Sequence, residues 1–187
     1  MSSFDLARFI DDCREALGTS DPPKAVQSIM AQALRDPAAL QAALEVNRNG
    51  QGDPRQYVVL AQSPELTMMK VFCPGRLLSP PHNHLTWAVI GLYRGHEDNV
   101  FYHREGARLV EDERRTLRAP EVLVLQADAI HRIANPLPEP SYGIHVYGGS
   151  LGNPARSLWN PFTLIEEPFA PDVMLKYERE LAKRGLD

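Results

Sequence analysis

A series of short apolar runs between residues 55 and 147 restricts the fold more than any other feature of this sequence. Each run is rich in β-branched and aromatic residues, and glycine, proline, asparagine or charged residues separate one run from the next. The runs are YVVLA, LTMMKVF, TWAVIGLY, NVFYH, RLVE, EVLVL and YGIHVY. Many short strands at even spacing predict an all-β barrel or sandwich, and a double-sheet jelly roll fits their number.

Helical patterns flank this region on both sides. Before it, apolar residues recur at helical spacing, and Asp21-Pro22 and Asp36-Pro37 are typical helix starts. After it, a tail rich in proline and glycine leads to PDVMLKYERELAKR, which predicts a final helix. We therefore expect a helical extension over residues 1–54 that packs on a barrel formed by residues 55–187. Together they should form a single structural domain.

Composition and charge exclude several classes of function. The 187 residues include 24 acidic and 20 basic side chains, a formal net charge of −4, which argues against nucleic acid as the main partner. The longest apolar runs are far shorter than the roughly 18–20 residues that span a membrane. Cys13 and Cys73 are the only cysteines, so a disulfide framework is not indicated. We expect a cytoplasmic monomer or homodimer that acts on small molecules.

Two histidines separated by one residue, His82 and His84, follow the proline pair 80–81. On a strand, residues i and i+2 point to the same face, so both imidazoles can converge on one point inside a barrel. Imidazole is a common ligand for zinc, copper, iron and nickel. The alternative is that both histidines are ordinary surface residues in a loop.

A third histidine, His131, begins another short run and is followed after three residues by Asn135. Together the two stretches resemble the two metal motifs of the cupin superfamily, in which HxH is followed by a glutamate and a glycine, and a later His-x-x-x-Asn completes the site. His82, His84 and Gly95 match the first motif. The resemblance implies a double-stranded β-helix, the jelly-roll cupin fold.

The cupin resemblance lacks its acidic ligand, because Ala88 or Val89 stands where the glutamate belongs. Three neutral histidines would leave the charge of a divalent metal unbalanced. Such a site should favour an anionic substrate that binds the metal directly, such as a thiolate or a carboxylate. Glu97 comes too late in the chain for the usual ligand position, and we expect it to be an exposed residue at a strand end.

The stretch SYGIHVYGG adds His145 and Tyr147, two residues apart on an expected strand. With HNHLTWAVIGLYRG and the distant His131, it resembles the cysteine dioxygenase family of thiol dioxygenases, and most of all its bacterial members of the 3-mercaptopropionate type. The resemblance runs from about residue 55 to residue 161. Asn83 stands where the family usually has aspartate, and should point away from the metal.

This resemblance implies an enzyme with one Fe(II) per chain, held by His82, His84 and His131. Nickel, zinc and manganese are alternatives for the metal that is actually loaded. The substrates would be a small thiol and O2, and both oxygen atoms would end on sulfur as a sulfinate. His145 and Tyr147 match the family's pair beside the metal, in which the tyrosine hydroxyl points toward the iron.

Two further points of the family pattern concern the substrate and the His–Tyr pair. A substrate carboxylate calls for a guanidinium, and Arg55 and Arg156 match arginines of two branches of the family by rough spacing. The family usually has a serine two residues before its conserved histidine, where this chain has Gly143; Ser141, four residues before His145, would lie on the same face but further off. This departure puts the proton-relay part of the arrangement in doubt.

Two other classes of function compete with thiol dioxygenation. One is a metal-dependent cupin of a different reaction class, such as an isomerase or another oxygenase of a small carbonyl compound. The other is a non-catalytic cupin that binds a small ligand. The pair His145 and Tyr147 separates them from an oxygenase, because a simple binding protein does not need a phenol aimed at the open face of a metal.

Overall fold

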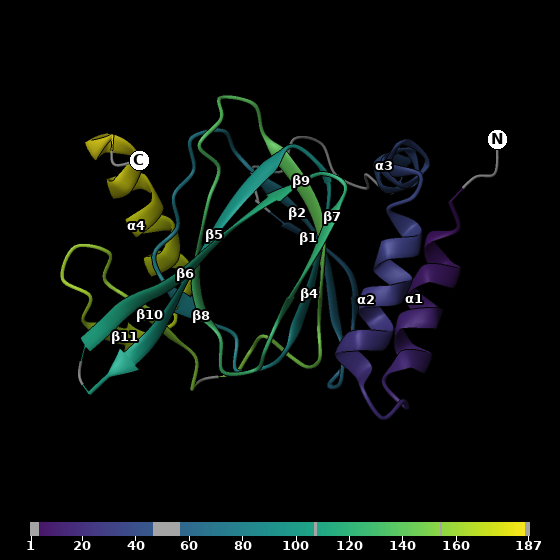
Figure 1. The fold of residues 1–187 in the computed structure, drawn as a ribbon, viewed down its shortest axis with the longest axis horizontal. Coiled ribbons are helices and arrows are strands. Elements are labelled where there is room, and N and C mark those ends of the chain that lie inside the picture. The colour runs from purple at the N-terminus through teal and green to yellow at the C-terminus, as the bar shows by residue number, and fades with distance from the viewer. Residues whose placement is uncertain (1–3, 47–56, 107, 154, 186–187) are drawn as a thin grey trace.

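The computed structural model describes residues 4–46, 57–106, 108–153 and 155–185, and it confirms the jelly-roll cupin fold with helices at both ends (Figure 1). The helices are α1 (Leu6–Ala16), α2 (Pro22–Ala33), α3 (Pro37–Val46) and α4 (Pro171–Arg184). The strands are β1 (Tyr57–Gln62), β2 (Thr67–Cys73), β3 (His82–Asn83), β4 (Ala88–Arg94), β5 (His96–Glu105), β6 (Arg108–Arg118), β7 (Glu121–Leu125), β8 (Ile130–Ala134), β9 (Ser141–Tyr147), β10 (Ser157–Trp159) and β11 (Glu166–Pro168).

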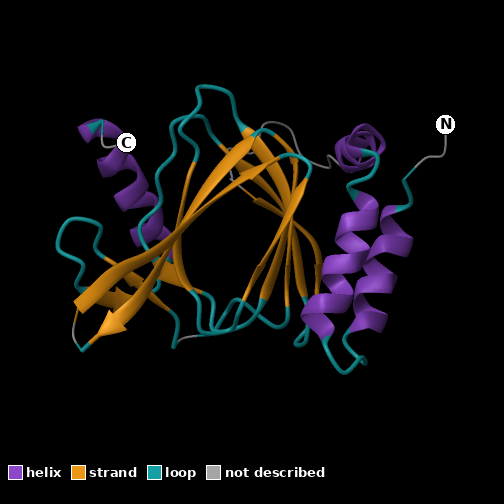
Figure 2. Ribbon diagram, in the orientation of Figure 1, coloured by secondary structure: helices purple, strands orange, loops and turns teal. Residues whose placement is uncertain are grey.

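The strands form two antiparallel sheets that face one another (Figure 2). The five-stranded sheet has the order β1-β2-β9-β4-β7, and the six-stranded sheet has the order β11-β10-β3-β8-β5-β6. The pairs β1–β2, β5–β6 and β10–β11 are consecutive in the chain, and every other neighbouring pair comes from distant parts of it, as the jelly roll requires. The space between the sheets holds an apolar core and, as described below, the three histidines.

Strand β4 shows why its sequence is an uninterrupted apolar run rather than an alternating one. Ala88, Ile90 and Leu92 face the interior of the barrel, while Val89 packs on the helices outside. A strand that is buried on both faces has no position for a polar side chain. The interior cluster also includes Met69, Leu117, Leu123, Leu125 and Tyr147.

The N-terminal helices cover the outer face of the five-stranded sheet (Figure 1). Asp5 and Asp21 cap α1 and α2 by accepting hydrogen bonds from backbone N–H groups three residues later. The side chain of Met30 lies directly over Gly91, where a Cβ atom would fall 2.3 Å from the methionine sulfur. The expected extension therefore packs on the barrel, and its expected boundary at residue 54 lies outside the described residues.

Helix α4 begins and ends where the sequence predicts it, and it packs at the opposite end of the molecule from α1–α3 (Figure 1). Tyr177 and Leu181 are its buried residues, and the Tyr177 hydroxyl donates to the carboxylate of Glu167 beside β10 and β11. Among the described residues, no helix is long and apolar enough to cross a membrane. Cys13 and Cys73 are free thiols, and burial raises the pKa of each to about 12.

Candidate metal centre

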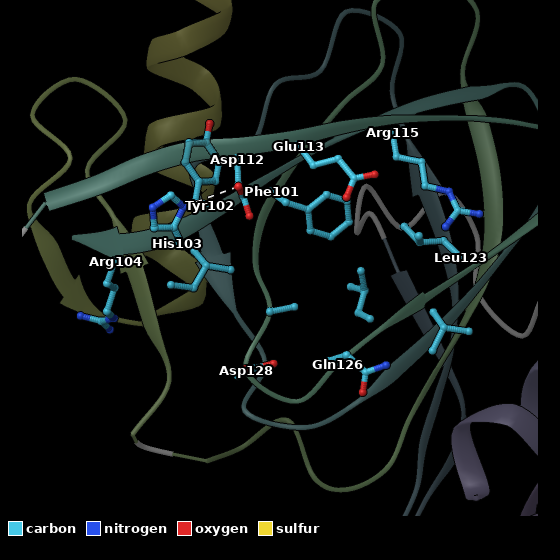
Figure 3. Close-up of a pocket in the computed structure, with 14 residues that line it drawn as sticks. Phe101, Tyr102, His103, Arg104, Asp112, Glu113, Arg115, Leu123, Gln126 and Asp128 are labelled. Carbon is cyan, nitrogen blue, oxygen red and sulfur yellow. Dashed lines mark ion pairs between the residues drawn. The ribbon is translucent and has the colours of Figure 1, made fainter.

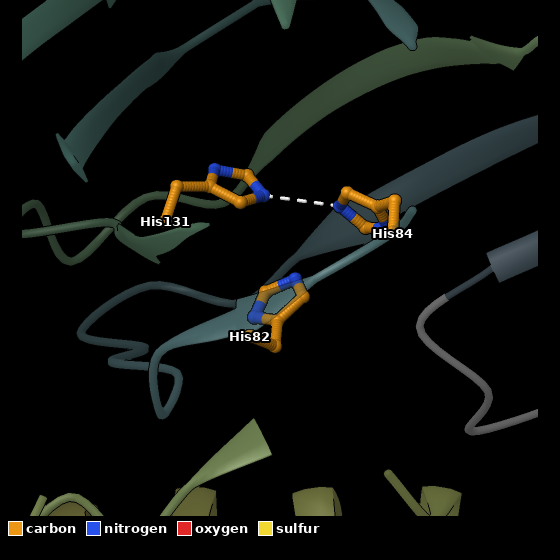
Figure 4. A group of neighbouring side chains, drawn as sticks. All are labelled: His82, His84 and His131. Atoms are coloured by element: carbon orange, nitrogen blue, oxygen red, sulfur yellow. Dashed lines mark hydrogen bonds between the residues drawn. The ribbon is translucent and has the colours of Figure 1, made fainter. Parts of the chain in front are cut away.

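Three histidines converge inside the barrel from two neighbouring strands of the six-stranded sheet (Figure 4). His82 on β3 lies directly opposite His131 on β8 in the ladder, so their side chains share a face. His84 follows immediately after β3, and Leu85 then turns the chain with a positive φ of 54°. A left-handed backbone is uncommon for a residue other than glycine, and such geometry is concentrated at functional sites.

The ligand atoms of these three histidines all lie within 4.8 Å of one another. The Nε2 atoms of His84 and His131 are 3.1 Å apart. Two imidazole nitrogens held at about 2.1 Å from one metal ion, at right angles, would be separated by about 3.0 Å. The three residues therefore fit a single metal ion, and among the described residues they form a group that can hold one.

Hydrogen bonds at the other ring nitrogens fix which atoms are free to bind a metal. The Nδ1 atom of His82 lies 3.0 Å from the carbonyl oxygen of Pro80, and that of His131 lies 3.0 Å from Oδ1 of Asn99. Both acceptors require a proton on Nδ1, which leaves the lone pair on Nε2. The fold thus presents Nε2 of both residues to the shared centre.

All three imidazoles are neutral near pH 7, which is the form that binds metals. The histidines are between 2% and 7% exposed. Burial lowers the pKa of His82 to about 4. Burial, together with the neighbouring histidines and Arg156, holds the pKa values of His84 and His131 well below the ordinary value.

Arg156, one of the two expected carboxylate-binding residues, lies at the site. Its side chain is buried against the ring of Phe169, and Nη2 lies 3.4 Å from Nδ1 of His84. Nε donates to the carbonyl oxygen of Asn83 at 3.0 Å, and Nη1 donates to that of Leu151 at 2.9 Å. A guanidinium has five N–H donors, and the two carbonyl oxygens use two of them. When His84 binds a metal through Nε2, its proton lies on Nδ1, so the N–H groups of Nη2 are then free for a ligand.

The other expected residue, Arg55, lies outside the described residues. Asn83, between the two paired histidines, points away from the centre as expected, because its Oδ1 accepts a hydrogen bond from the backbone N–H of Ser157. The two remaining motif residues serve the fold. Gly95 has a φ of 91° and no room for a side chain, and Asn135 bonds backbone groups of its own turn.

The pair His145 and Tyr147 faces the three histidines from the opposite, five-stranded sheet. Nδ1 of His145 and the hydroxyl of Tyr147 are 3.0 Å apart, and both residues are buried. The Tyr147 ring centroid lies 5.0 Å from that of His84. The structure therefore places His145 and Tyr147 beside His82 and His84, which lie more than sixty positions earlier in the sequence.

The absence of a serine at residue 143 has a visible consequence. Nε2 of His145 is buried and has no hydrogen-bond partner among the described residues. A Cβ atom on Gly143 would lie 3.5 Å from that nitrogen and 3.1 Å from the carbonyl oxygen of Gly91. A hydroxyl at this position would have reached Nε2, whereas Ser141 lies further along the strand, opposite Cys73 in the ladder.

The expectation that Glu97 is an exposed strand-end residue is wrong. Glu97 is 1% exposed, and its carboxylate accepts a hydrogen bond from Asn99, the residue that holds His131. Glu97 and Asn99 lie on the inward face of β5 with Phe101, whose ring stacks on that of His131. Sequence reasoning missed both residues, because this mixture of polar and apolar inward positions gives no alternating pattern.

A cavity of about 590 Å³ opens beside this group rather than at it, between the β5–β6 hairpin and the end of β7 (Figure 3). Phe101, Leu123 and Leu125 form its apolar wall, and Glu113 and Arg115 line it from β6. Its wall adjoins the site at the stacked rings of Phe101 and His131. The three histidines themselves do not line it.

The fold and the site together define a jelly-roll barrel with a three-histidine group that could hold a metal ion, and Ala88 faces the same interior. No protein-family model matches this chain. Solved structures with a similar fold include the cupin domain of Cnp3 from Schizosaccharomyces pombe, at 10% identity over 54% of this chain and 66% of that one, with a TM-score of 0.45.

Two further similar structures are bacterial. KdgF from Halomonas sp. is 18% identical over 56% of this chain and 90% of its own, with a TM-score of 0.45. A double-stranded β-helix protein from Klebsiella pneumoniae is 18% identical over 61% of this chain and 90% of its own, with a TM-score of 0.41. These are partial similarities of fold, and the chemistry of the site rests on its own residues.

Proposed function

We propose that this chain is a mononuclear iron enzyme that oxidises a small thiol carboxylate to its sulfinate with O2. The observation that carries the proposal is the buried His145–Tyr147 pair, which faces the three-histidine group from the opposite sheet. A phenol held by an imidazole serves to orient a small polar group beside the metal. A protein that merely binds a ligand has no use for this arrangement.

In this proposal His82, His84 and His131 hold Fe(II) through their Nε2 atoms. The iron supplies the site at which a thiolate and O2 meet, and three neutral ligands leave it with a positive charge that favours an anionic sulfur. The reaction balances without a further reductant. RSH and O2 give RSO2⁻ and one proton, sulfur loses four electrons, and O2 gains them as both its atoms bond to sulfur.

In this proposal the protein's own side chains bind and orient the substrate. The Nδ1–H of His145 donates to the oxygen of Tyr147, which leaves the phenolic proton free to donate toward the centre of the site. Burial raises the pKa of Tyr147, so the phenol stays protonated and acts as a donor at neutral pH. The N–H groups of Arg156 that the carbonyl oxygens of Asn83 and Leu151 leave unused are available to the substrate carboxylate, and the apolar interior excludes water.

The direct test is to load the purified protein anaerobically with Fe(II) and to record O2 uptake with cysteine, 3-mercaptopropionate, cysteamine and mercaptosuccinate. We expect one of them to give one sulfinate per O2 consumed. The activity should be lost in His84→Ala and kept in His103→Ala, which removes an exposed histidine outside the site. Protein that holds one iron per chain and oxidises none of the four thiols would refute the proposal.

A second candidate is a metal-dependent cupin of another class, acting on a small carbonyl compound with Ni, Mn or Zn. The engagement of Nε and Nη1 of Arg156 by carbonyl oxygens and the glycine at residue 143 favour it, since both weaken the match to a thiol dioxygenase. Isomerase and oxygenase assays of the protein loaded with each metal separate the two candidates. Turnover of a carbonyl substrate, without thiol oxidation by the iron form, would favour the second.

A further inference from the structure

A chain of three buried side chains connects a carboxylate to one of the metal-binding histidines. Oε1 of Glu97 accepts a hydrogen bond from Nδ2 of Asn99 at 3.0 Å, and Oδ1 of Asn99 lies 3.0 Å from Nδ1 of His131. All three residues are at most 2% exposed. Groups buried this deeply do not exchange their hydrogen bonds with water, so each bond constrains the next.

The direction of the chain follows from the chemistry of the amide. Burial raises the pKa of Glu97 to about 7, so at pH 8, where the metal affinities are measured, its side chain is mostly ionised. An ionised carboxylate can only accept, so it holds the NH2 group of Asn99 on its own side and turns the carbonyl oxygen toward His131. That oxygen in turn can only accept, so the proton of His131 must sit on Nδ1. The lone pair of His131 is then on Nε2, the atom that lies 3.1 Å from Nε2 of His84.

We propose that Glu97 is a positioning residue that prepares His131 to bind the metal, acting through Asn99. The inference rests on the metal site of the proposed function, but not on the reaction assigned to it. A carboxylate behind a histidine ligand is a common arrangement that fixes the ring and makes the imidazole a stronger ligand. Here an amide stands between the two and transmits the orientation.

Glu97 does not replace the missing acidic ligand directly. The group of side chains close enough to share one ion contains His82, His84 and His131 and leaves Glu97 out. When Glu97 is ionised, its negative charge nevertheless lies two hydrogen bonds from the metal position. A centre of three neutral ligands thus retains a carboxylate in the barrel interior, one that no substrate has to displace.

The test measures metal affinity, with Co(II) and Zn(II) as the probes and the metal-free full-length chain as the protein. Glu97→Gln keeps the shape of the side chain but lets it donate as well as accept, which releases the constraint on the amide. We expect Co(II) and Zn(II) to bind about tenfold more weakly to Glu97→Gln, within the range of about 10- to 100-fold for residues behind a metal ligand. The visible absorption bands of bound Co(II) should shift as well.

Asp98→Asn is the matched control, because it makes the same chemical change one residue away, on a side chain that contacts His96 and Thr116 instead. It should bind both metals as the unaltered protein does. Asn99→Asp places a carboxylate directly against Nδ1 of His131, so adding Glu97→Gln to it should cost much less than Glu97→Gln alone. Glu97→Asp, which keeps the charge, should recover part of the affinity.

Circular dichroism and thermal unfolding check that each variant is folded before its affinity is compared. The inference is overturned if folded Glu97→Gln binds Co(II) with unchanged affinity and an unchanged spectrum. It is also overturned if Asp98→Asn has the same effect as Glu97→Gln. If Glu97→Gln does not fold, the metal affinities of Glu97→Asp and Asn99→Asp are compared instead, as a test of the same inference. Because no thiol is present, a failure of the thiol dioxygenase proposal leaves these readings unaffected.

Discussion

Mild acid should destabilise the metal-free protein strongly, because its buried histidines must stay neutral in the folded state. Burial lowers the pKa of His82 to about 4 and that of His145 to about 3. In the unfolded chain a histidine has its ordinary pKa of about 6.5. Below that pH the unfolded state binds protons that the folded state excludes, so stability falls as the pH falls.

The size of the effect follows from these shifts. Between pH 7 and pH 5 each such histidine costs about 2 kcal/mol, so His82 and His145 together cost about 4 kcal/mol. Burial raises the pKa of Glu97 from 4.5 to about 7. As the pH falls, the folded state therefore takes up a proton on Glu97 before the unfolded state does. This adds about 2 kcal/mol to the free energy of unfolding over the same pH range. His84 and His131 act in the same direction as His82.

We therefore expect the free energy of unfolding to fall by more than about 2 kcal/mol from pH 7 to pH 5, out of the roughly 5–15 kcal/mol of a typical domain. Urea unfolding followed by tryptophan fluorescence, with a chelator present, measures it. His145→Gln should reduce the loss by about 2 kcal/mol, whereas His103→Gln, at a side chain that is 45% exposed, should leave it unchanged. Equal stability at pH 7 and pH 5 would refute the reasoning, because it would mean that the rings are hydrated.

Three further predictions test individual contacts. Tyr147→Phe should lower the rate of thiol oxidation about 100-fold or more, as loss of one aimed donor does, while the iron content measured by chelation stays the same; an unchanged rate would exclude a role for the hydroxyl. Gly143→Ser should be about 1 kcal/mol more stable to urea than Gly143→Ala, because only the hydroxyl can bond Nε2 of His145; equal stabilities would contradict this. Gly148→Ala should lower the free energy of unfolding by about 1–3 kcal/mol, because its Cβ would fall 2.1 Å from the Trp87 ring. If Gly148→Ala is as stable as the unaltered protein in thermal unfolding, the Trp87 ring can move aside and the prediction is wrong.

Most of the barrel could be predicted from the sequence because its longer strands are buried and leave a pattern. β4 is apolar up to its last residue, Arg94, because both faces are covered, and β7 is apolar after Glu121. The strands that escaped prediction are β3, β10 and β11, which are two or three residues long. A ladder that short leaves no periodicity to detect, and its position is decided by the strands on either side.

Only some residues of the candidate site could be predicted from the sequence. His82, His84 and His131 stand out because imidazoles at strand spacing serve few other purposes. Glu97 and Asn99 do not stand out, because a buried carboxylate and a surface carboxylate look alike in a sequence. Only the register of β5 against β8 places Asn99 beside the ring it holds. The environment of Gly143 likewise depends on its approach to Gly91 across the sheet.

The ligands and the residues that would direct the reaction come from opposite sheets. Strands β3 and β8 of one sheet carry the histidines of the metal centre, and β9 of the other carries His145 and Tyr147. Substitutions in β9 would therefore alter the surroundings of the site without removing any of the three histidines. With this arrangement, residues on β9 can change while the three histidines stay the same. Gly143, at the position where a serine would reach His145, is a change of this kind.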